Sequence, residues 1–322
     1  MNPWPTVLLI AAAAAAVVIA IAYICFRMAF YVPESSKPDG EAILLPDGKI
    51  YEPYHRAMTD WILETRAMPH EEMTITSFDG LTLHGRFFEF APGAPIELMV
   101  HGYRGTGERD LCGGVQRCFS IGRSCLLVDQ RAAGRSEGNV ISFGINEHRD
   151  CLMWVDHLIR RFGPEIPIIL TGISMGASTV MMAAGEPLPD NVVGVIADCG
   201  FTSAREIICK IIGEMKLPCR MAYPFVKLGA RLFGHFDLDA KSAVEAMRRC
   251  RIPVFFIHGE NDDFVPCSMS RACYEACRAP KYLFTVPGAG HGLGYLTDLK
   301  GYVRALTVFS RANGIPIDPQ EE

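Results

Sequence analysis

A serine between two glycines is the first candidate for chemistry in this sequence. The pentapeptide Gly172-Ile173-Ser174-Met175-Gly176 follows an apolar run at 168–172 and precedes a helical pattern. A strand, a sharp turn and a helix form the context in which a serine hydroxyl is presented as a nucleophile. Such a turn leaves no room for a Cβ at Gly172 or Gly176. It also sets Ser174 at a helix N-terminus, where the backbone dipole favours developing negative charge.

A second glycine-rich segment offers an oxyanion hole. The sequence His101-Gly102-Tyr103-Arg104-Gly105 follows the apolar run Ile96–Val100. Two backbone N–H groups usually hold the oxyanion that forms when a serine attacks an acyl carbonyl, and each contributes about 3 kcal/mol. We expect Tyr103 and Met175 to supply these N–H groups. His101 stands at a strand end, and we interpret it as a structural histidine that hydrogen-bonds the loop.

Two later loops offer a base and an acid, in the chain order serine, acid, histidine. His291 lies in a glycine-rich loop after the apolar run Lys281–Val286, where it could take the Ser174 proton and return it to the leaving group. The acid should follow the run Pro253–His258. The candidates are Asp262, Asp263 and, as a distant third, Glu260. Asp262 is the better candidate, but spacing alone does not decide between it and Asp263.

The elements that must position these residues alternate along the chain. Asp79-Gly80 predicts a hairpin between strands at 73–78 and 81–90. Short apolar runs then alternate with helical patterns such as Ile145–Phe162 and Ala177–Ala184, which predicts a mainly parallel sheet with helices on both faces. Ligands of such sheets bind at the carboxyl ends of the strands. The predicted strands are 96–100, 125–129, 168–172, 192–198, 253–258 and 281–286.

The N-terminal segment predicts a membrane anchor. Residues 7–26 are apolar and carry no charge. A run of this length is enough to cross a hydrocarbon core as a helix. A cleaved signal peptide would need a basic n-region and a shorter core, and residues 1–5 hold no Lys or Arg. Arg27, Lys37 and Lys49 follow the run, so the positive-inside rule places the catalytic domain in the cytoplasm.

The charge and the cysteines narrow the class of protein. The chain has 322 residues and a net charge of −5, and no basic stripe suggests nucleic acid as a partner. Its 12 cysteines form no CxxC pair or metal-ligand set, and Cys273 and Cys277 could at most share a helix face. We interpret the thiols as reduced and expect no metal.

An insertion between the predicted strands at 192–198 and 253–258 predicts a small lid. It should span about 203–236 as two amphipathic helices split at Pro218. One interpretation is a packed cap with a solvated basic face, and the other is a lid that meets anionic lipid headgroups. The basic residues concerned are Lys210, Lys216, Arg220, Lys227 and Arg231.

Six segments together resemble a known family. They are HGYRGTGERD (101–110), DQRAAGRSEG (129–138), GISMGAS (172–178), DCGFTS (198–203), HGENDDFVP (258–266) and GAGHG (288–292). The chain resembles α/β hydrolases of the membrane-anchored bacterial type, described as serine-aminopeptidase-like or lysophospholipase-like. It is also similar to ABHD-type thioesterases and lipases. The resemblance implies an α/β-hydrolase fold, places the acid on Asp262, and implies hydrolysis of an ester, thioester or amide without a cofactor. The loop with Arg131 and Arg135 is expected to brace the site.

The sequence therefore predicts an anchor at 1–32, a junction at 33–72 and a catalytic domain at 73–316. We expect a serine esterase or thioesterase with the triad Ser174, Asp262 and His291. Its substrate would be a small-molecule or lipid acyl compound. A peptidase or amidase, an acyltransferase and a membrane-tethered binding module are the alternatives.

Overall fold

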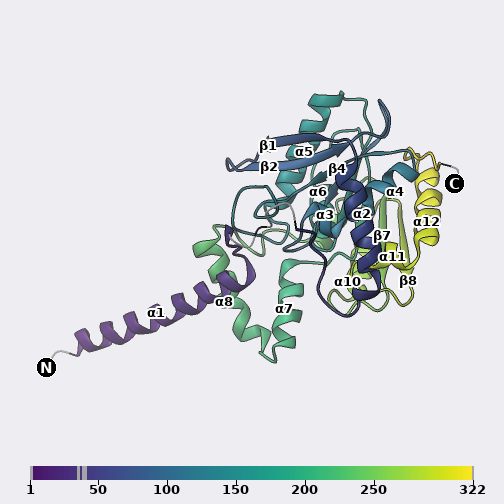
Figure 1. The fold of residues 1–322 in the computed structure, drawn as a ribbon. Helices are drawn as coiled ribbons and strands as arrows, with labels where there is room; N and C mark the ends of the chain where they lie inside the picture. The colour runs from purple at the N-terminus through teal and green to yellow at the C-terminus, as the bar shows by residue number, and fades with distance from the viewer. Residues whose placement is uncertain (1–2, 35–36, 38–41, 321–322) are drawn as a thin grey trace.

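The computed structural model describes residues 3–34, 37 and 42–320 of the chain. Most of residues 33–40, at the start of the predicted junction, lie outside the described residues. Figure 1 shows a sheet flanked by helices, with one long N-terminal helix projecting from the body. That helix, α1 (Trp4–Ala29), extends the predicted apolar segment at both ends. The junction contains two consecutive helices, η2 (Glu52–Tyr54) and α2 (His55–Ala67).

One eight-stranded sheet organises the body. Its strand order is β1-β2-β4-β3-β5-β6-β7-β8. The first two strands form the predicted antiparallel hairpin, β2 pairs antiparallel with β4, and the remaining neighbours are parallel. The strands are β1 (Glu71–Thr76), β2 (Thr82–Phe88), β3 (Ile96–Val100), β4 (Ser124–Val128), β5 (Ile168–Ile173), β6 (Val192–Asp198), β7 (Val254–Gly259) and β8 (Lys281–Val286).

The buried strands agree with the sequence prediction to within a residue or so at each end. Strands β3 and β4 are buried at every position, as expected of parallel strands covered on both faces. The mainly parallel eight-stranded sheet predicted from the alternating pattern is therefore confirmed. Ser174, the predicted nucleophile, directly follows β5, near the middle of the sheet.

Helices cover both faces of the sheet. On one face, Trp154, Val180 and Cys273 belong to the large apolar core, and on the other face Val115 and Leu306 belong to two smaller clusters. The helices after α2 are α3 (Gly107–Asp110), α4 (Gly114–Ser120), α5 (Glu147–Phe162), α6 (Met175–Ala184), α7 (Ala204–Glu214), α8 (Cys219–Phe233), α9 (Ala243–Met247), α10 (Cys267–Ala276), α11 (Gly294–Thr297) and α12 (Leu299–Ala312).

A buried ionic cluster joins the centre of the sheet to the helices on one face. Glu97 of β3 accepts hydrogen bonds from Arg117 and Arg123, at 2.5 and 2.7 Å. Burial alone would raise the pKa of Glu97, but the two guanidinium groups lower it to about 2. Arg123 also donates to Ser310 Oγ of α12 and to the carbonyl of Pro316. The pair of arginines therefore compensates the buried carboxylate and ties the C-terminal helix to the sheet.

The insertion predicted at about 203–236, called the lid below, contains two helices, α7 and α8, with Pro218 between them. Three of its predicted basic residues form ion pairs within the lid region: Lys210 with Glu214, Lys227 with Asp239, and Arg231 with Asp237. This arrangement supports the interpretation as a packed cap with a paired, solvated face.

The prediction that all thiols are reduced is wrong for one pair. The structure joins Cys209 of α7 to Cys219 of α8 in a disulfide that links the two lid helices. The signal was hidden because the two cysteines are ten residues apart and become neighbours only when the chain turns at Pro218. The other ten cysteines are free, and Cys273 and Cys277 are both buried.

Candidate active site

The nucleophile elbow has the geometry that its glycines predict. Ser174 has φ 56° and ψ −119°, a strained backbone for a residue with a Cβ, and it directly precedes α6. A Cβ on Gly172 would lie 2.2 Å from the carbonyl oxygen of Gly176. A Cβ on Gly176 would lie 2.0 Å from the carbonyl oxygen of Val100. Both positions therefore require glycine, because backbone atoms occupy the space of any side chain.

A chain of hydrogen bonds connects the three residues predicted as the triad. His291 Nε2 lies 2.9 Å from Ser174 Oγ, and His291 Nδ1 lies 2.6 Å from Asp262 Oδ2. Ser174 follows β5, Asp262 follows β7 and His291 follows β8, so the carboxyl ends of three strands bring them together. With Nδ1 protonated, His291 presents a lone pair to the serine hydroxyl, which is the arrangement of a general base.

The three acid candidates differ in their contacts. Both oxygens of Asp262 are used, because Oδ1 accepts from the N–H groups of Phe264 and Val265 while Oδ2 faces His291. Asp263 contributes its carbonyl oxygen to Lys210. Glu260 accepts from the hydroxyl of Thr285 at the surface. Among the described residues, only Asp262 of these three contacts His291.

A second histidine, which the sequence analysis did not single out, supports Asp262. His258 is fully buried, and its Nε2 lies 3.2 Å from Asp262 Oδ2. Burial alone would raise the pKa of Asp262, but hydrogen bonds from His258 and His291 lower it to about 2. The acid therefore stays ionised at neutral pH and can stabilise a protonated His291. A histidine that ends a predicted strand was the only available signal for this role.

The predicted oxyanion segment, 101–105, lies against the serine, and together with the next residue it is called the oxyanion loop (101–106). A Cβ on Gly102 would approach Ser174 Cβ to 3.3 Å. No hydrogen bond to another described residue occupies the backbone N–H of Tyr103 or Met175, so both remain available to an oxyanion. His101 is structural, as predicted, since its Nε2 accepts from the N–H of Gln130.

Two further residues, which the sequence analysis did not assign to the site, shape it. Asp110, at the end of the segment 101–110, accepts from the N–H of Gly102 at 2.9 Å, and its carboxylate fills the space that a side chain on Gly105 would need. Tyr51, from the predicted junction, donates its hydroxyl to the carbonyl oxygen of His291. Both contacts hold loops of the site, and the contact of Tyr51 comes from a segment that no motif connects to it.

The predicted bracing role of the loop at 129–138 also holds. Arg131 donates to both oxygens of Asp150 and to Asp79 of the hairpin turn. Arg135 pairs with Glu72 at the surface. Both arginines lie outside the set that lines the cavity of Ser174, so they act as supports of the sheet edge.

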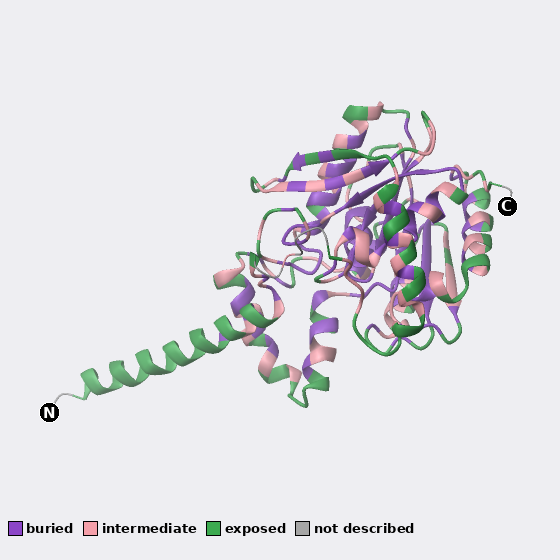
Figure 2. Ribbon diagram, in the orientation of Figure 1, coloured by how far each residue is buried: buried purple, intermediate pink, exposed green. Residues whose placement is uncertain are grey.

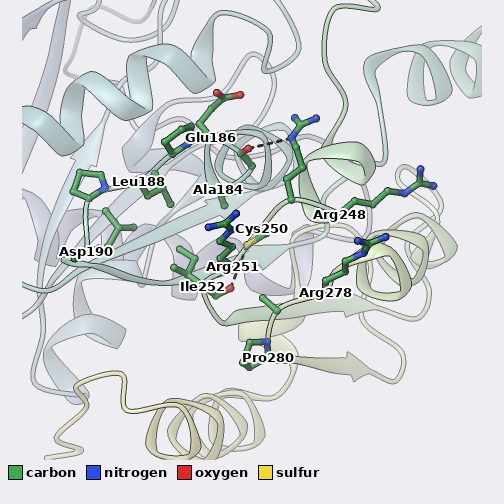
Figure 3. Close-up of a pocket in the computed structure, with 16 residues that line it drawn as sticks. Ala184, Glu186, Leu188, Asp190, Arg248, Cys250, Arg251, Ile252, Arg278 and Pro280 are labelled. Carbon is green, nitrogen blue, oxygen red and sulfur yellow. Dashed lines mark hydrogen bonds between the residues drawn. The ribbon is translucent and has the colours of Figure 1, made fainter.

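Ser174 opens into a cavity of about 470 Å³ that is lined in part by Tyr51, Tyr103, Phe264 and His291. A larger cavity of about 1230 Å³ lies at the amino ends of β6, β7 and β8. Its wall includes Arg248, Arg251 and Arg278 (Figure 3). The larger cavity holds no serine, histidine or cysteine nucleophile paired with a base among its lining residues, apart from the buried Cys250. The smaller cavity, which contains Ser174 and His291, is therefore the candidate active site.

Three side chains at the site carry atoms that can bind a metal ion. Ligand atoms of Cys199, Asp262 and His291 lie within 4.8 Å of one another. Burial raises the pKa of the Cys199 thiol well above its usual value, so the thiolate that a metal needs is disfavoured. Asp262 and His291 are already hydrogen-bonded to each other. This cluster fits a proton relay better than a cation site.

Parts of the chain are similar in sequence to known proteins. No protein-family model matches the chain. The uncharacterized protein YqkD of Bacillus subtilis is 29% identical over 192 residues, which cover 59% of this chain and 63% of that protein. The lysophosphatidylserine lipase ABHD12 of Danio rerio is 28% identical over 209 residues, 60% of this chain and 50% of the lipase. The chain thus matches less than two thirds of either relative.

Among solved structures, an esterase of Pyrococcus furiosus, PF2001, superposes with a TM-score of 0.62. The two chains are 20% identical, and the superposition covers 77% of this chain and 93% of the esterase. At this level of identity the likeness concerns the arrangement of strands and helices.

Proposed function

The chain has the α/β-hydrolase fold, and from this premise we propose that it is a membrane-anchored serine hydrolase of carboxylic esters or thioesters. The observation that carries the proposal is the hydrogen-bonded series Ser174, His291, Asp262 at the mouth of a cavity. A serine in an ordinary turn would need neither a histidine at hydrogen-bond distance nor a buried carboxylate behind that histidine.

The geometry supports a two-step reaction. His291 Nε2 takes the hydroxyl proton as Ser174 Oγ attacks the acyl carbonyl, and the N–H groups of Tyr103 and Met175 hold the oxyanion. His291 then gives its proton to the departing alkoxide or thiolate, leaving an acyl-enzyme. Water repeats the sequence: it loses a proton to His291, attacks the acyl carbon, and releases a carboxylic acid as the proton returns to Ser174.

Labelling of the full-length protein with a fluorophosphonate tests the proposal. We expect rapid labelling of the wild type and none of Ser174→Ala, with hydrolysis lowered by about 10⁴-fold or more in the variant. Ser120→Ala removes an exposed hydroxyl on α4 and is the matched control, which should label like the wild type. Equal labelling of Ser174→Ala and the wild type would contradict the assignment.

A substrate panel defines the acyl group. The cavity of about 470 Å³ has Tyr51, Tyr103 and Phe264 in its wall, which favours an apolar acyl chain. We therefore expect p-nitrophenyl esters of medium chain length to exceed the acetate in kcat/KM, with acyl-CoA and anilide substrates as the thioester and amide arms. Faster turnover of the anilides than of any ester would replace the esterase with a peptidase or amidase.

Helix α1 is the proposed anchor. It has 26 residues and is long and apolar enough to span a bilayer. Figure 2 shows it exposed along most of its length. Retention of the protein in the membrane fraction after alkaline carbonate, but not after detergent, is the expected result. A soluble protein after carbonate would contradict the anchor.

The orientation is proposed from charge. Arg27 lies in the last turn of α1, which by the positive-inside rule places the catalytic domain in the cytoplasm. A disulfide between Cys209 and Cys219 is rare in that compartment. The disulfide and the charge therefore favour opposite orientations, and maleimide labelling in freshly lysed cells decides between them. Reaction of both Cys209 and Cys219 with the maleimide would support the cytoplasmic orientation. Protection of the pair, together with cleavage of the domain by external protease, would reverse the orientation.

A further inference from the structure

The oxyanion loop, residues 101–106, is in contact with the end of the proposed anchor. The hydroxyl of Tyr103 donates to the carbonyl oxygen of Ala29 at 2.8 Å. The guanidinium of Arg104 donates to the carbonyls of Met28 and Tyr31, at 3.0 and 3.2 Å. The last carbonyls of a helix have no partner within the helix, and a cation near them is stabilised by the helix dipole. The loop side chains therefore cap α1.

These contacts fall on a strained part of the loop. Arg104 has φ 53°, a left-handed backbone that a residue with a side chain adopts only when its surroundings impose it. The residue before it is Tyr103, whose backbone N–H is the proposed oxyanion donor. Within the loop, the N–H of Gly105 reaches the carbonyl of Gly102 at 3.3 Å, a long hydrogen bond. The polar contacts to α1 thus flank the proposed donor and restrict its direction.

The end of α1 is itself fixed in the catalytic domain. Phe26 and Phe30 are buried in the main core. Phe30 meets Phe143 edge to face, and Phe143 also packs on the ring of Tyr103 at 5.0 Å. Beyond the helix, Val32 donates to the carbonyl of Asn139 and pairs this segment with the loop after β4. The end of α1 is therefore a rigid support and not the start of a loose tether.

The lid holds the same helix from the other side. A Cβ on Gly229 of α8 would lie 2.4 Å from the carbonyl oxygen of Ala22, so the two helices cross at close range. Phe233 of α8 packs against Tyr23 and Phe26. Figure 1 shows α8 beside the end of α1 where α1 leaves the body. Lid, anchor and oxyanion loop thus form one connected unit.

We infer that the last turn of α1 positions the oxyanion hole, with Tyr103 and Arg104 as the positioning residues. This inference rests on the proposed function. The anchor then has a second role besides holding the enzyme in a membrane, because it fixes the direction of a backbone N–H that acts in the transition state. Removing the contacts should lower kcat and leave KM unchanged, since an oxyanion donor acts on the transition state more than on the bound substrate.

The test uses full-length protein in detergent micelles with a soluble short-chain ester. Tyr103→Phe keeps the ring on Phe143 and removes only the hydroxyl, and Arg104→Ala removes both guanidinium contacts. We expect kcat to fall about fivefold and about tenfold, respectively, with KM within twofold of the wild type. Arg104→Lys keeps a cation near the helix end and should recover part of the loss.

A matched control separates positioning from general damage. Tyr54→Phe removes a tyrosine hydrogen bond of 3.3 Å to Thr297 at the surface, and its kcat should equal that of the wild type. The rate of fluorophosphonate labelling should fall in parallel with kcat in the Tyr103 and Arg104 variants, because phosphonylation uses the same hole. If Arg104→Ala fails to fold, Tyr103→Phe decides.

The inference is overturned if Tyr103→Phe and Arg104→Ala keep the kcat of Tyr54→Phe, or if their loss lies in KM alone. Failure of the proposed function has a different signature. In that case the wild type itself shows no hydrolysis or labelling that depends on Ser174.

Discussion

The nucleophile elbow and the oxyanion loop meet at one proposed carbonyl-binding point, but they are held by different kinds of contact. The elbow is fixed by backbone packing inside the sheet, where Gly172 and Gly176 touch the main chain. The loop is fixed by polar side chains that reach out of the sheet to the end of α1. Backbone packing tolerates no side chain, whereas side-chain contacts can be removed one at a time. A single substitution in the elbow should therefore disrupt the fold or the activity strongly, whereas each lost contact of the loop should lower the activity only in part.

The largest expected effect tests the relay that both regions serve. Asp262→Asn should lower kcat by about 10³- to 10⁴-fold, because the amide no longer fixes the His291 tautomer or stabilises its protonated form. Asp263→Asn should change kcat by less than about tenfold. Steady-state kinetics on one ester measure both. Equal losses in the two variants would mean that the acid has been misassigned.

Gly176→Ala tests the elbow. The new Cβ would lie 2.0 Å from the carbonyl oxygen of Val100, which belongs to a central strand and cannot move freely. We expect the free energy of unfolding to fall by about 3 kcal/mol or more, or the protein not to fold. Gly213→Ala in α7 is the control, because nothing lies within 4 Å of its added Cβ. Denaturant unfolding measures the stability of both variants. If Gly176→Ala were as stable as Gly213→Ala, the elbow would not be fixed by backbone packing.

Gly229→Ala tests, in the same way, the close crossing of α8 with α1. Alanine has a higher helix propensity than glycine by about 1 kcal/mol, so a neutral site would gain stability. Here the Cβ would meet the carbonyl oxygen of Ala22 at 2.4 Å and displace α1 from α8. We expect the variant to lose about 1–2 kcal/mol relative to Gly213→Ala and to lower kcat a few-fold. Thermal unfolding and kinetics in detergent check both, and a stabilised, fully active variant would argue against a tight crossing.

The smallest expected effect concerns a carboxyl behind the elbow. Burial raises the pKa of Asp198 to about 6, and among the described residues no group hydrogen-bonds its Oδ1. A raised carboxyl pKa means that the folded protein binds more protons than the unfolded chain between about pH 4 and 6, so stability falls as pH rises through that window. Asp198→Asn should therefore stabilise the protein at pH 8 by on the order of 1 kcal/mol, and less at pH 5.

Asp262 has the opposite sign and provides an internal check. Its pKa of about 2 lies below the ordinary value, so its contribution to stability is complete above about pH 4 and is lost as pH falls toward 2. Melting temperatures of the wild type and Asp198→Asn across this range would separate the two carboxyls. A gain from Asp198→Asn that is equal at pH 5 and pH 8 would contradict the assigned pKa.

Much of the site could be predicted because its motifs are local. The glycines around Ser174 and the strand before it specify the elbow within a few residues, and the chain order of serine, acid and histidine identifies His291. The choice between Asp262 and Asp263 could not be made from spacing, because adjacent carboxylates differ only in the direction in which the loop turns them. Tyr51 supports the site through a contact with His291, which is far along the chain, and no local pattern encodes such a contact. His258 and Asp110 are close in the chain to the groups they contact, Asp262 and Gly102, but their spacing does not show which way each side chain turns.

The sequence by itself determined the alternation of strands and helices, the elbow and the apolar length of α1, since each depends on periodicity or on steric limits within a short segment. Only the tertiary structure decided that the end of this helix packs in the core beside α8 and accepts hydrogen bonds from Tyr103 and Arg104. The apolar composition of a segment predicts that it is removed from water, but it does not predict which residues the segment packs against. The partners of a helix end are fixed by the packing of the whole chain.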